Sequence, residues 1–155
     1  MGFLLDGVWT DDEHWPTDGA GRFTREQARF RVPGGELALE PGRYHLVLAH
    51  ACPWCHRVAI ARELTGLADA VSVSYVDPIM REGGWRFTDE EHRDPLFGSA
   101  YAHELYVRTD PAFSGRVTVP ILWDRHQGRI VCNESTDLVE ILDRNRATPA
   151  PTLFP

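Results

Sequence analysis

The chain has 155 residues, of which 43% are hydrophobic, so it has the size and composition of one globular domain with a sizeable core. Its formal charge is −7 and its basic residues are dispersed, which argues against nucleic acid or an anionic membrane as the main partner. No apolar run approaches the roughly 18 residues of a membrane span, and the N-terminus does not resemble a secretory signal, so we expect a cytoplasmic protein.

Residues 1–40 show little periodicity and are rich in Gly, Asp and Glu, which predicts an irregular N-terminal extension. Turns are predicted where Gly and Pro cluster at 33–35 and at 41–42, and residues 36–39 are predicted as a short edge strand. We expect four aromatic side chains to pack the extension onto the domain that follows it: Trp9, Trp15, Phe23 and Phe30.

The next stretch combines a buried strand, two cysteines and the start of a helix. The apolar run 44–49 predicts the strand, and a helical pattern begins near Trp54. Pro53 suits the first helical position, where no N–H group is needed. A thiolate at a helix N-terminus is stabilised by unpaired N–H groups and by the helix dipole. We therefore expect Cys52 to be the attacking thiol and Cys55, one turn further along, to be the resolving thiol.

The cysteines also allow readings other than a redox pair. A pair of cysteines at this spacing is also half of a zinc site, but no second Cys/His pair is evident, so we expect no metal. Cys132 is predicted to be a buried, unreactive cysteine, with a position beside the thiol site as the alternative. His56 and Arg57 follow the cysteines and add positive potential at the start of the helix.

The middle of the chain predicts one βαβ unit and a long connection. The helical pattern ends at Gly66, and residues 71–76 alternate as a strand parallel to the first. Residues 77–98 form the connection, in which Trp85 is either a lid or wall over the thiol site or a tryptophan held in the core. Residues 99–109 are predicted as a helix capped by Ser99, with a spacing that pairs Glu104 with Arg108.

The last part predicts a strand hairpin and a helix. Pro120 lies inside a strand pattern, so it belongs at a bulge or at the strand start, and a cis Val119–Pro120 bond resolves the conflict. A hairpin turns at residues 127–128, and Asn133 or Ser135 caps a final apolar helix. The order β-α-β-α-β-β-α is the α/β, thioredoxin-like arrangement of a mixed sheet flanked by helices, with the domain at residues 41–146.

Several motifs in the same order resemble the N-terminal domain of the Xi-class glutathione transferases, the glutathionyl-hydroquinone reductases. The resemblance covers about residues 40–145, and the start of the chain is similar to that family's N-terminal extension. The motifs are Cys52-Pro53-Trp54 with His56-Arg57, Asp77-Pro78, Gly84-Trp85-Arg86-Phe87, the run from Ser114 to Asp124, and Asn133-Glu134-Ser135.

The resemblance implies a thioredoxin-like domain followed by an all-helical domain, and a thiol-dependent reductase. In that reaction Cys52 takes the glutathionyl group off a quinol, and a second glutathione regenerates the enzyme as glutathione disulfide. Glutathione is then the co-substrate. Because all basic residues are arginine, which is typical of GC-rich genomes, another low-molecular-weight thiol stays open as the co-substrate.

The resemblance also implies which residues bind glutathione. Trp85 and Arg116 contact it, and the Val119 backbone before cis Pro120 pairs with its cysteinyl main chain. Glu134 and Ser135 hold the γ-glutamyl end. Residue chemistry agrees on the last point, because a helix N-terminus with a free hydroxyl suits a carboxylate and an adjacent carboxylate suits an amino group. Without the resemblance, these two residues read as an ordinary helix cap.

Two departures from the family keep other functions open. Typical members have alanine in place of Cys55, so a glutaredoxin-like dithiol oxidoreductase acting on mixed disulfides is the main alternative. Residues 147–155 resemble the start of a linker to the helical domain, which supplies the aromatic quinol pocket in the family. A non-catalytic docking module is a third reading, and it predicts an ordinary thiol pKa of about 8.5 at Cys52. A homodimer is one option for the assembly.

Overall fold

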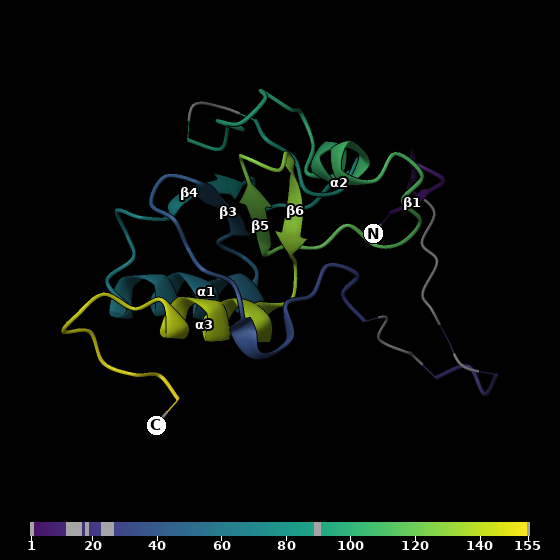
Figure 1. Cartoon of the computed structure of the whole chain (residues 1–155). Helices are drawn as coiled ribbons and strands as arrows, with labels where there is room; N and C mark the ends of the chain where they lie inside the picture. The colour runs from purple at the N-terminus through teal and green to yellow at the C-terminus, as the bar shows by residue number, and fades with distance from the viewer. Residues whose placement is uncertain (1, 12–16, 18, 23–26, 89–90, 155) are drawn as a thin grey trace.

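The computed structural model describes residues 2–11, 17, 19–22, 27–88 and 91–154, and it shows the predicted thioredoxin-like fold (Figure 1). The central sheet has the strand order β4-β3-β5-β6. Strands β3 and β4 are parallel, and β5 and β6 run antiparallel to their neighbours. The sheet elements are β3 (Tyr44–Ala49), β4 (Ser72–Val76), β5 (Ile121–Asp124) and β6 (Arg129–Cys132), and the helices are α1 (Pro53–Leu64), α2 (His103–Thr109) and α3 (Ser135–Arg144).

The helices cover both sides of the sheet. Helices α1 and α3 lie side by side below the sheet in Figure 1, and α2 lies above them beside β6. All six residues of β3 are buried, which fits its mainly apolar sequence, and the one histidine in it, His45, is hydrogen-bonded to Ser72 and Ser74. Helix α1 begins at Pro53, as predicted, and the chain leaves it through Gly66, whose φ of 71° is the left-handed conformation that glycine adopts without strain.

Helix α2 is shorter than predicted, and its proposed cap is wrong. The helix begins at His103, and no side chain caps its N-cap residue, Ala102. The Glu104 carboxylate instead accepts hydrogen bonds from the backbone N–H groups of Ala100 at 2.8 Å and Tyr101 at 2.9 Å. Arg108, the predicted partner of Glu104, lies over the ring of Phe97. The carboxylate therefore closes the turn before the helix.

Neither Asn133 nor Ser135 is the N-cap residue of α3, whereas the alternative reading of Glu134 as part of a helix cap is confirmed. The N-cap residue is Glu134, whose side chain accepts a hydrogen bond from the backbone N–H of Thr136 at 3.3 Å. Asn133 makes longer-range contacts, because its Oδ1 accepts from the N–H of Phe30 at 3.1 Å and its Nδ2 donates to the Tyr106 hydroxyl at 3.0 Å. Asn133 thus joins the N-terminal extension to α2.

The described part of the extension contains a hairpin that the sequence does not predict. Residues Phe3–Leu5 and Val8–Thr10 form an antiparallel hairpin, β1–β2. Trp9 packs against the core and stacks on the His103 ring at a centroid distance of 4.7 Å, and Phe30 packs on Phe113 at 5.8 Å, as predicted. The predicted contacts of Trp15 and Phe23 lie outside the described residues.

The predicted edge strand at 36–39 does not form. A single 3-10 turn, η1 (Pro33–Gly35), precedes this segment. The side chain of Asn145 hydrogen-bonds the backbone of residues 36–39. It accepts from the N–H of Leu39 at 2.9 Å and donates to the main-chain oxygen of Leu37 at 2.8 Å. The amide side chain of the residue that caps the C-terminus of α3 therefore takes the place of a neighbouring strand.

The segment before β5 agrees with the prediction. The Val119–Pro120 peptide bond is cis, and Pro120 lies immediately before the strand, so no ladder hydrogen bond is lost.

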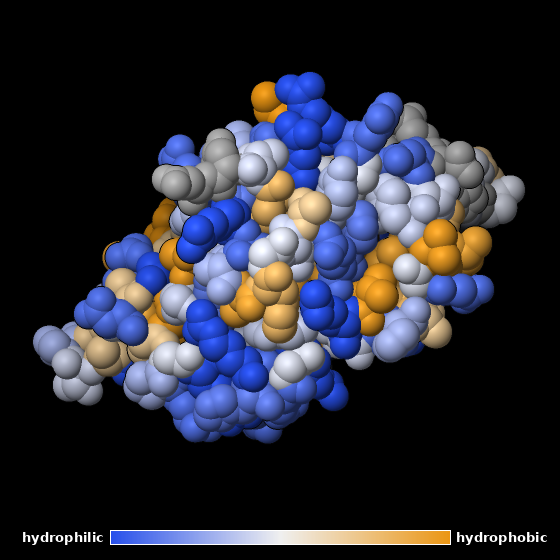
Figure 2. Space-filling model, turned by 90° about the horizontal axis from the view of Figure 1, so that it is seen from above, coloured by the Kyte–Doolittle hydropathy of each residue, from blue (hydrophilic) through white to orange (hydrophobic). Residues whose placement is uncertain are grey.

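Figure 2 shows hydrophobic groups reaching the surface between hydrophilic ones on the face seen from above. Within the described ranges, the longest helices are too short and too polar to cross a membrane.

Candidate thiol active site

A cavity of about 820 Å³ opens at the N-terminal ends of α1 and α3. Its walls come from these two helix ends, from residues 113–120 and from the N-terminal extension. Cys52 lines it, and so do all six residues predicted to bind glutathione: Trp85, Arg116, Val119, Pro120, Glu134 and Ser135. The fold thus brings together residues that are spread over more than 80 positions of the sequence.

Cys52 is the N-cap residue of α1, and only 8% of it is exposed. Its Sγ lies 3.6 Å from the main-chain oxygen of Val119. A hydrogen bond from the Cys55 thiol lowers the pKa of Cys52 to about 6, with further help from the backbone N–H groups of Cys55 and Trp54 and against the effect of burial. These are the donors expected at a helix N-terminus, and they favour the thiolate at neutral pH.

Cys55 lies behind Cys52, and 1% of it is exposed. Its hydrogen bond to Cys52 and its burial both raise the pKa of the Cys55 thiol, so Cys55 holds its proton while Cys52 is a thiolate. Cys55 is not among the described residues that line the cavity. A reagent in the cavity therefore reaches the sulfur of Cys52 first, and Cys55 contacts that sulfur from the buried side.

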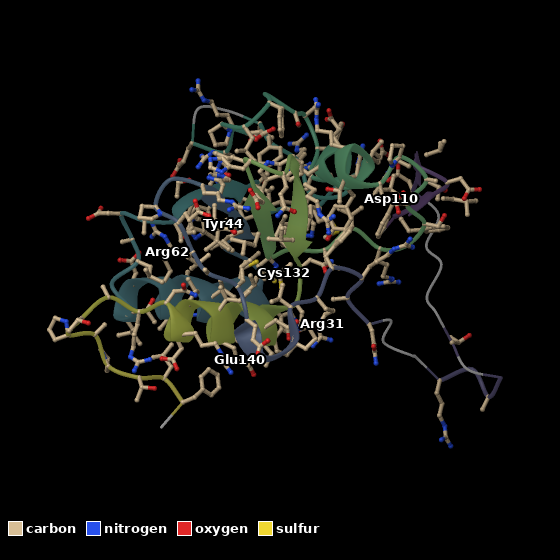
Figure 3. All side chains as sticks on the ribbon, viewed as in Figure 1. Arg31, Tyr44, Arg62, Asp110, Cys132 and Glu140 are labelled. Carbon is tan, nitrogen blue, oxygen red and sulfur yellow. The ribbon has the colours of Figure 1, made fainter. Side chains whose placement is uncertain are left out.

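Cys132 is a buried thiol that is not among the described residues lining the cavity, although it lies directly behind the wall residues Asn133 and Glu134. Figure 3 shows it between the sheet and the layer formed by α1 and α3. It is fully buried, its Sγ donates to the main-chain oxygen of Glu134 at 3.6 Å, and burial raises its pKa to about 12. These properties agree with the predicted unreactive cysteine.

Among the described residues, no three His, Cys, Asp or Glu side chains form a cluster that could hold a metal ion.

The N-terminus of α3 carries an ordered polar cluster. The Ser135 hydroxyl lies 3.4 Å from Oε1 of Glu134. The guanidinium of Arg57 reaches across from α1, where it donates to the hydroxyls of Ser135 and Thr136 and lies 3.9 Å from the Glu134 carboxylate. Sequence reasoning assigned Arg57 only a general positive potential. Its spacing from residue 134 in the sequence gave no signal of this contact.

The buried side chain of Tyr106 holds the backbone of the segment before the cis-proline. Its hydroxyl donates to the oxygen of Thr118 at 2.7 Å and accepts from the N–H of the same residue at 3.1 Å. The amide Nδ2 of Asn133 also donates to this hydroxyl, at 3.0 Å. Tyr106 is fully buried, so this network fixes the backbone beside Val119. The sequence marked Tyr106 only as part of a helix.

Trp85 combines its two predicted alternatives. It lines the cavity as a wall, and it is also partly buried against the core. Its main-chain oxygen accepts from the N–H of Ala102 at 2.8 Å, which ties the long connection to the start of α2. Arg116, on the opposite segment, lines the same cavity.

Comparison with known proteins identifies the family. The model described as "Glutathione S-transferase, N-terminal domain" matches residues 51–145. The chain belongs to this family. Two curated relatives are the glutathionyl-hydroquinone reductase PcpF of Sphingobium chlorophenolicum, 45% identical over 92% of the chain, and YqjG of Escherichia coli, 41% identical over 92% of it. The chain spans about half the length of these two relatives, 47% of PcpF and 48% of YqjG.

Solved structures agree with this assignment. A Xi-class glutathione transferase from Natrialba magadii superimposes with a TM-score of 0.80, 37% identity and coverage of 100% of this chain and 49% of its own. The glutathione-bound structure of YqjG from Escherichia coli gives a TM-score of 0.79, 38% identity and coverage of 99% and 50%. The resemblance to the Xi class and the predicted fold are therefore confirmed.

Proposed function

We propose that this chain is the thiol-bearing, glutathione-binding part of a glutathionyl-hydroquinone reductase. One observation carries the proposal: the activated sulfur of Cys52 opens into the cavity that all six predicted glutathione-binding residues line. Two relatives that are glutathionyl-hydroquinone reductases match 92% of the chain at 41–45% identity, which supports the same reaction class here. Because the reaction consumes reduced thiol, we place it in the cytoplasm.

The proposed reaction has two thiol steps. The Cys52 thiolate attacks the sulfur of the glutathionyl-hydroquinone, and an S–S bond forms as the C–S bond breaks. The electron pair of the C–S bond goes to the ring carbon, which takes up a proton from solvent, and the free hydroquinone leaves. A second glutathione thiolate then attacks the glutathionyl sulfur of the mixed disulfide. This step releases glutathione disulfide and returns Cys52 as a thiolate.

The cavity walls suggest how glutathione is oriented. The hydroxyl of Ser135 and the N-terminus of α3 would receive the α-carboxylate of the γ-glutamyl group, and the Glu134 carboxylate its ammonium group. The Val119 backbone would pair with the cysteinyl main chain. Since Val119 already contacts Cys52, this pairing would place the glutathione sulfur next to the protein thiol.

The adjacent Cys55 thiol favours a second candidate, a glutaredoxin-like dithiol oxidoreductase. Cys55 hydrogen-bonds Cys52 in the first turn of α1, so it is placed to attack a mixed disulfide on Cys52 and release the bound thiol. That route would yield a Cys52–Cys55 disulfide, which a further thiol must reduce. Mixed disulfides of peptides or small thiols would be its substrates.

Turnover with two cysteine variants separates the candidates. Glutathionyl-menadiol and excess glutathione are incubated with wild type, Cys52→Ala and Cys55→Ser, and release of free menadiol is followed. The reductase proposal predicts turnover that is lost in Cys52→Ala and kept in Cys55→Ser. Absence of menadiol release from wild type, together with reduction of a glutathionylated peptide that needs both cysteines, would favour the dithiol candidate and overturn the proposal.

A further inference from the structure

We propose that Asp11 and His103 are positioning residues that hold the cavity-lining Trp85 in place from outside the cavity. They do so by binding both backbone groups of Gly83, which lies two residues before Trp85. The inference rests on the proposed function, in which Trp85 contacts glutathione. It deepens that function, because it gives the N-terminal extension a role in glutathione binding.

Asp11 and His103, here called the Gly83 clamp, bind the two sides of one residue. The N–H of Gly83 donates to Oδ1 of Asp11 at 2.9 Å, and the main-chain oxygen of Gly83 lies 3.2 Å from Nδ1 of His103. Because a carbonyl oxygen only accepts, Nδ1 of His103 carries the proton in this contact. Asp11 belongs to the N-terminal extension, and His103 is the first residue of α2. The clamp therefore fixes the long connection between two segments that are distant in sequence.

Aromatic rings support both members of the clamp. The His103 ring stacks on the ring of Trp9 at a centroid distance of 4.7 Å and on the ring of Tyr101 at 5.0 Å. The indole N–H of Trp9 donates to Oδ1 of Asp11 at 2.9 Å. The N–H of Gly83, followed by this indole N–H, lowers the pKa of the Asp11 carboxyl. Asp11 is therefore an ionised acceptor at neutral pH, and charged acceptors form the stronger hydrogen bonds.

The clamped turn lies directly against these rings. Gly83 and Gly84 both have a φ of 81°, the left-handed conformation that glycine adopts without strain. A Cβ at Gly83 would lie 2.3 Å from the Tyr101 ring, and a Cβ at Gly84 would lie 2.7 Å from the Trp9 ring. The two glycines thus allow the backbone to approach the rings that support the clamp.

The turn connects two residues of the cavity wall. Met80 and Trp85 both line the cavity, and the N–H of Gly84 donates to the main-chain oxygen of Arg81 at 2.9 Å between them. The main-chain oxygen of Trp85 then accepts from the N–H of Ala102 at 2.8 Å. The backbone is therefore held before Trp85 by the clamp and at Trp85 by the start of α2. These contacts determine where the indole lies in the wall.

Variants of Asp11 test the clamp, because this residue is exposed and is not among the described residues that line the cavity. Asp11→Ala removes the acceptor, whereas Asp11→Asn keeps an oxygen that can accept from Gly83. The matched control is Asp69→Ala, which removes the same charge at an exposed position in the turn between α1 and β4. Thermal melting verifies that each variant is folded.

The first readout is amide hydrogen exchange of residues 80–87, measured by mass spectrometry without any ligand. Asp11→Ala and His103→Ala should each speed this exchange about threefold to tenfold, because one bond to Gly83 is lost. Asp11→Asn and Asp69→Ala should exchange like wild type. Unchanged exchange in Asp11→Ala would overturn the clamp.

The second readout connects the clamp to glutathione. The Cys52 thiolate attacks one sulfur of glutathione disulfide, which forms the mixed disulfide and releases one glutathione thiolate. Asp11→Ala should slow this reaction about threefold to tenfold and leave alkylation of Cys52 by iodoacetamide unchanged, since only the first reagent uses the glutathione site. Asp11→Asn should restore the wild-type rate. Adding Asp11→Ala to Trp85→Ala should slow the reaction no further than Trp85→Ala alone, because the clamp acts through Trp85.

Additive losses in the double variant, or equal slowing of both reagents by Asp11→Ala, would overturn the positioning role. Faster exchange with an unchanged glutathione disulfide rate would overturn the role in glutathione binding. A wild type that reacts with iodoacetamide and not with glutathione disulfide would contradict the proposed function. Because hydrogen exchange needs no ligand, the clamp and the proposed function can fail separately.

Discussion

The sulfur of Cys52 lies 3.6 Å from the main-chain oxygen of Val119, which is the residue before the cis-proline. This contact joins the N-terminus of α1 to the segment that enters β5, two parts of the chain that are 67 positions apart. A glutathione that pairs with Val119 would therefore bring its sulfur to the protein thiol. The predictions below concern the groups that create and support this contact.

The first prediction concerns the reactivity of the three cysteines. Because only the thiolate reacts, the rate of Cys52 alkylation by iodoacetamide should rise with pH through a midpoint near 6, the pKa that its hydrogen-bond donors produce. Cys55 and Cys132 are buried thiols with raised pKa values, so they should stay unmodified in the folded protein. A midpoint near the ordinary value of about 8.5 would contradict activation and would favour a non-catalytic docking module.

The second prediction separates two roles of Cys55. Cys55→Ser keeps a hydroxyl donor toward Cys52, whereas Cys55→Ala removes the donor, so only the alanine variant should raise the pKa of Cys52 clearly. Neither variant can form an internal disulfide. If Cys55 acts mainly as a donor, Cys55→Ser should keep glutathionyl-menadiol turnover near neutral pH. An equal loss of turnover in both variants, with an unchanged Cys52 pKa, would indicate a resolving role instead.

Local patterns in the sequence predict the parts of the fold that depend on neighbouring residues. The buried run at 44–49, Pro53 at the first helical position and Gly66 after the helix each follow from short-range chemistry, and the structure places them as predicted. The family motifs likewise bring the predicted glutathione contacts to one cavity. Short-range signals were sufficient wherever the local preference and the tertiary environment agree.

The errors have two origins, a competing local contact and contacts across the fold. Ser99 is predicted to cap α2, but the Glu104 carboxylate, three and four residues further on, accepts from the backbone N–H groups of Tyr101 and Ala100 in the turn before the helix. Residues 36–39 are predicted as an edge strand, yet the side chain of Asn145, the C-cap residue of α3, binds their backbone groups. The hairpin β1–β2 turns at Asp6-Gly7, a local hairpin signal that the sequence prediction did not use. Its pairing to Gly115 spans more than 100 residues and has no signature at local spacing.

The third prediction concerns Arg57. Its guanidinium holds the hydroxyls of Ser135 and Thr136 and lies beside the Glu134 carboxylate, so Arg57→Gln should loosen the proposed γ-glutamyl site. We expect the KM for glutathione to rise about tenfold, with a smaller change in kcat. The KM for cysteinylglycine, which lacks the γ-glutamyl group, should stay constant.

The matched control for Arg57→Gln is Arg129→Gln, which changes the net charge equally at an exposed position of β6. This control should leave both KM values unchanged. If Arg57→Gln raised the KM of glutathione and of cysteinylglycine by the same factor, the arginine would not act through the γ-glutamyl end.

The fourth prediction concerns His45, a histidine in β3 that is 1% exposed and hydrogen-bonds Ser72 and Ser74. Burial, with a smaller contribution from the nearby Arg125, lowers its pKa from 6.5 to about 4. Between pH 4 and pH 6.5, the His45 imidazole is therefore protonated in the unfolded chain and neutral in the folded chain. Stability should fall as the pH decreases from 6.5 to 4, with a total loss of about 3 kcal/mol from this group.

Urea unfolding at several pH values between 4 and 7.5 tests the role of His45. The free energy of unfolding of wild type should fall more steeply with decreasing pH than that of His45→Gln, since acidic groups contribute equally to both proteins. His126→Gln, at an exposed position in the turn between β5 and β6, is the control and should follow wild type. Parallel curves for wild type and His45→Gln would contradict the assignment.

The most direct test of the proposed chemistry is a single turnover in the absence of free glutathione. Cys55→Ser is mixed with one equivalent of glutathionyl-menadiol, and both free menadiol and the protein are analysed by mass spectrometry. We predict one menadiol released per chain and one glutathionyl group bound as a mixed disulfide on Cys52. Release of menadiol without this adduct, or equal release by Cys52→Ala, would contradict the assignment of Cys52 as the nucleophile.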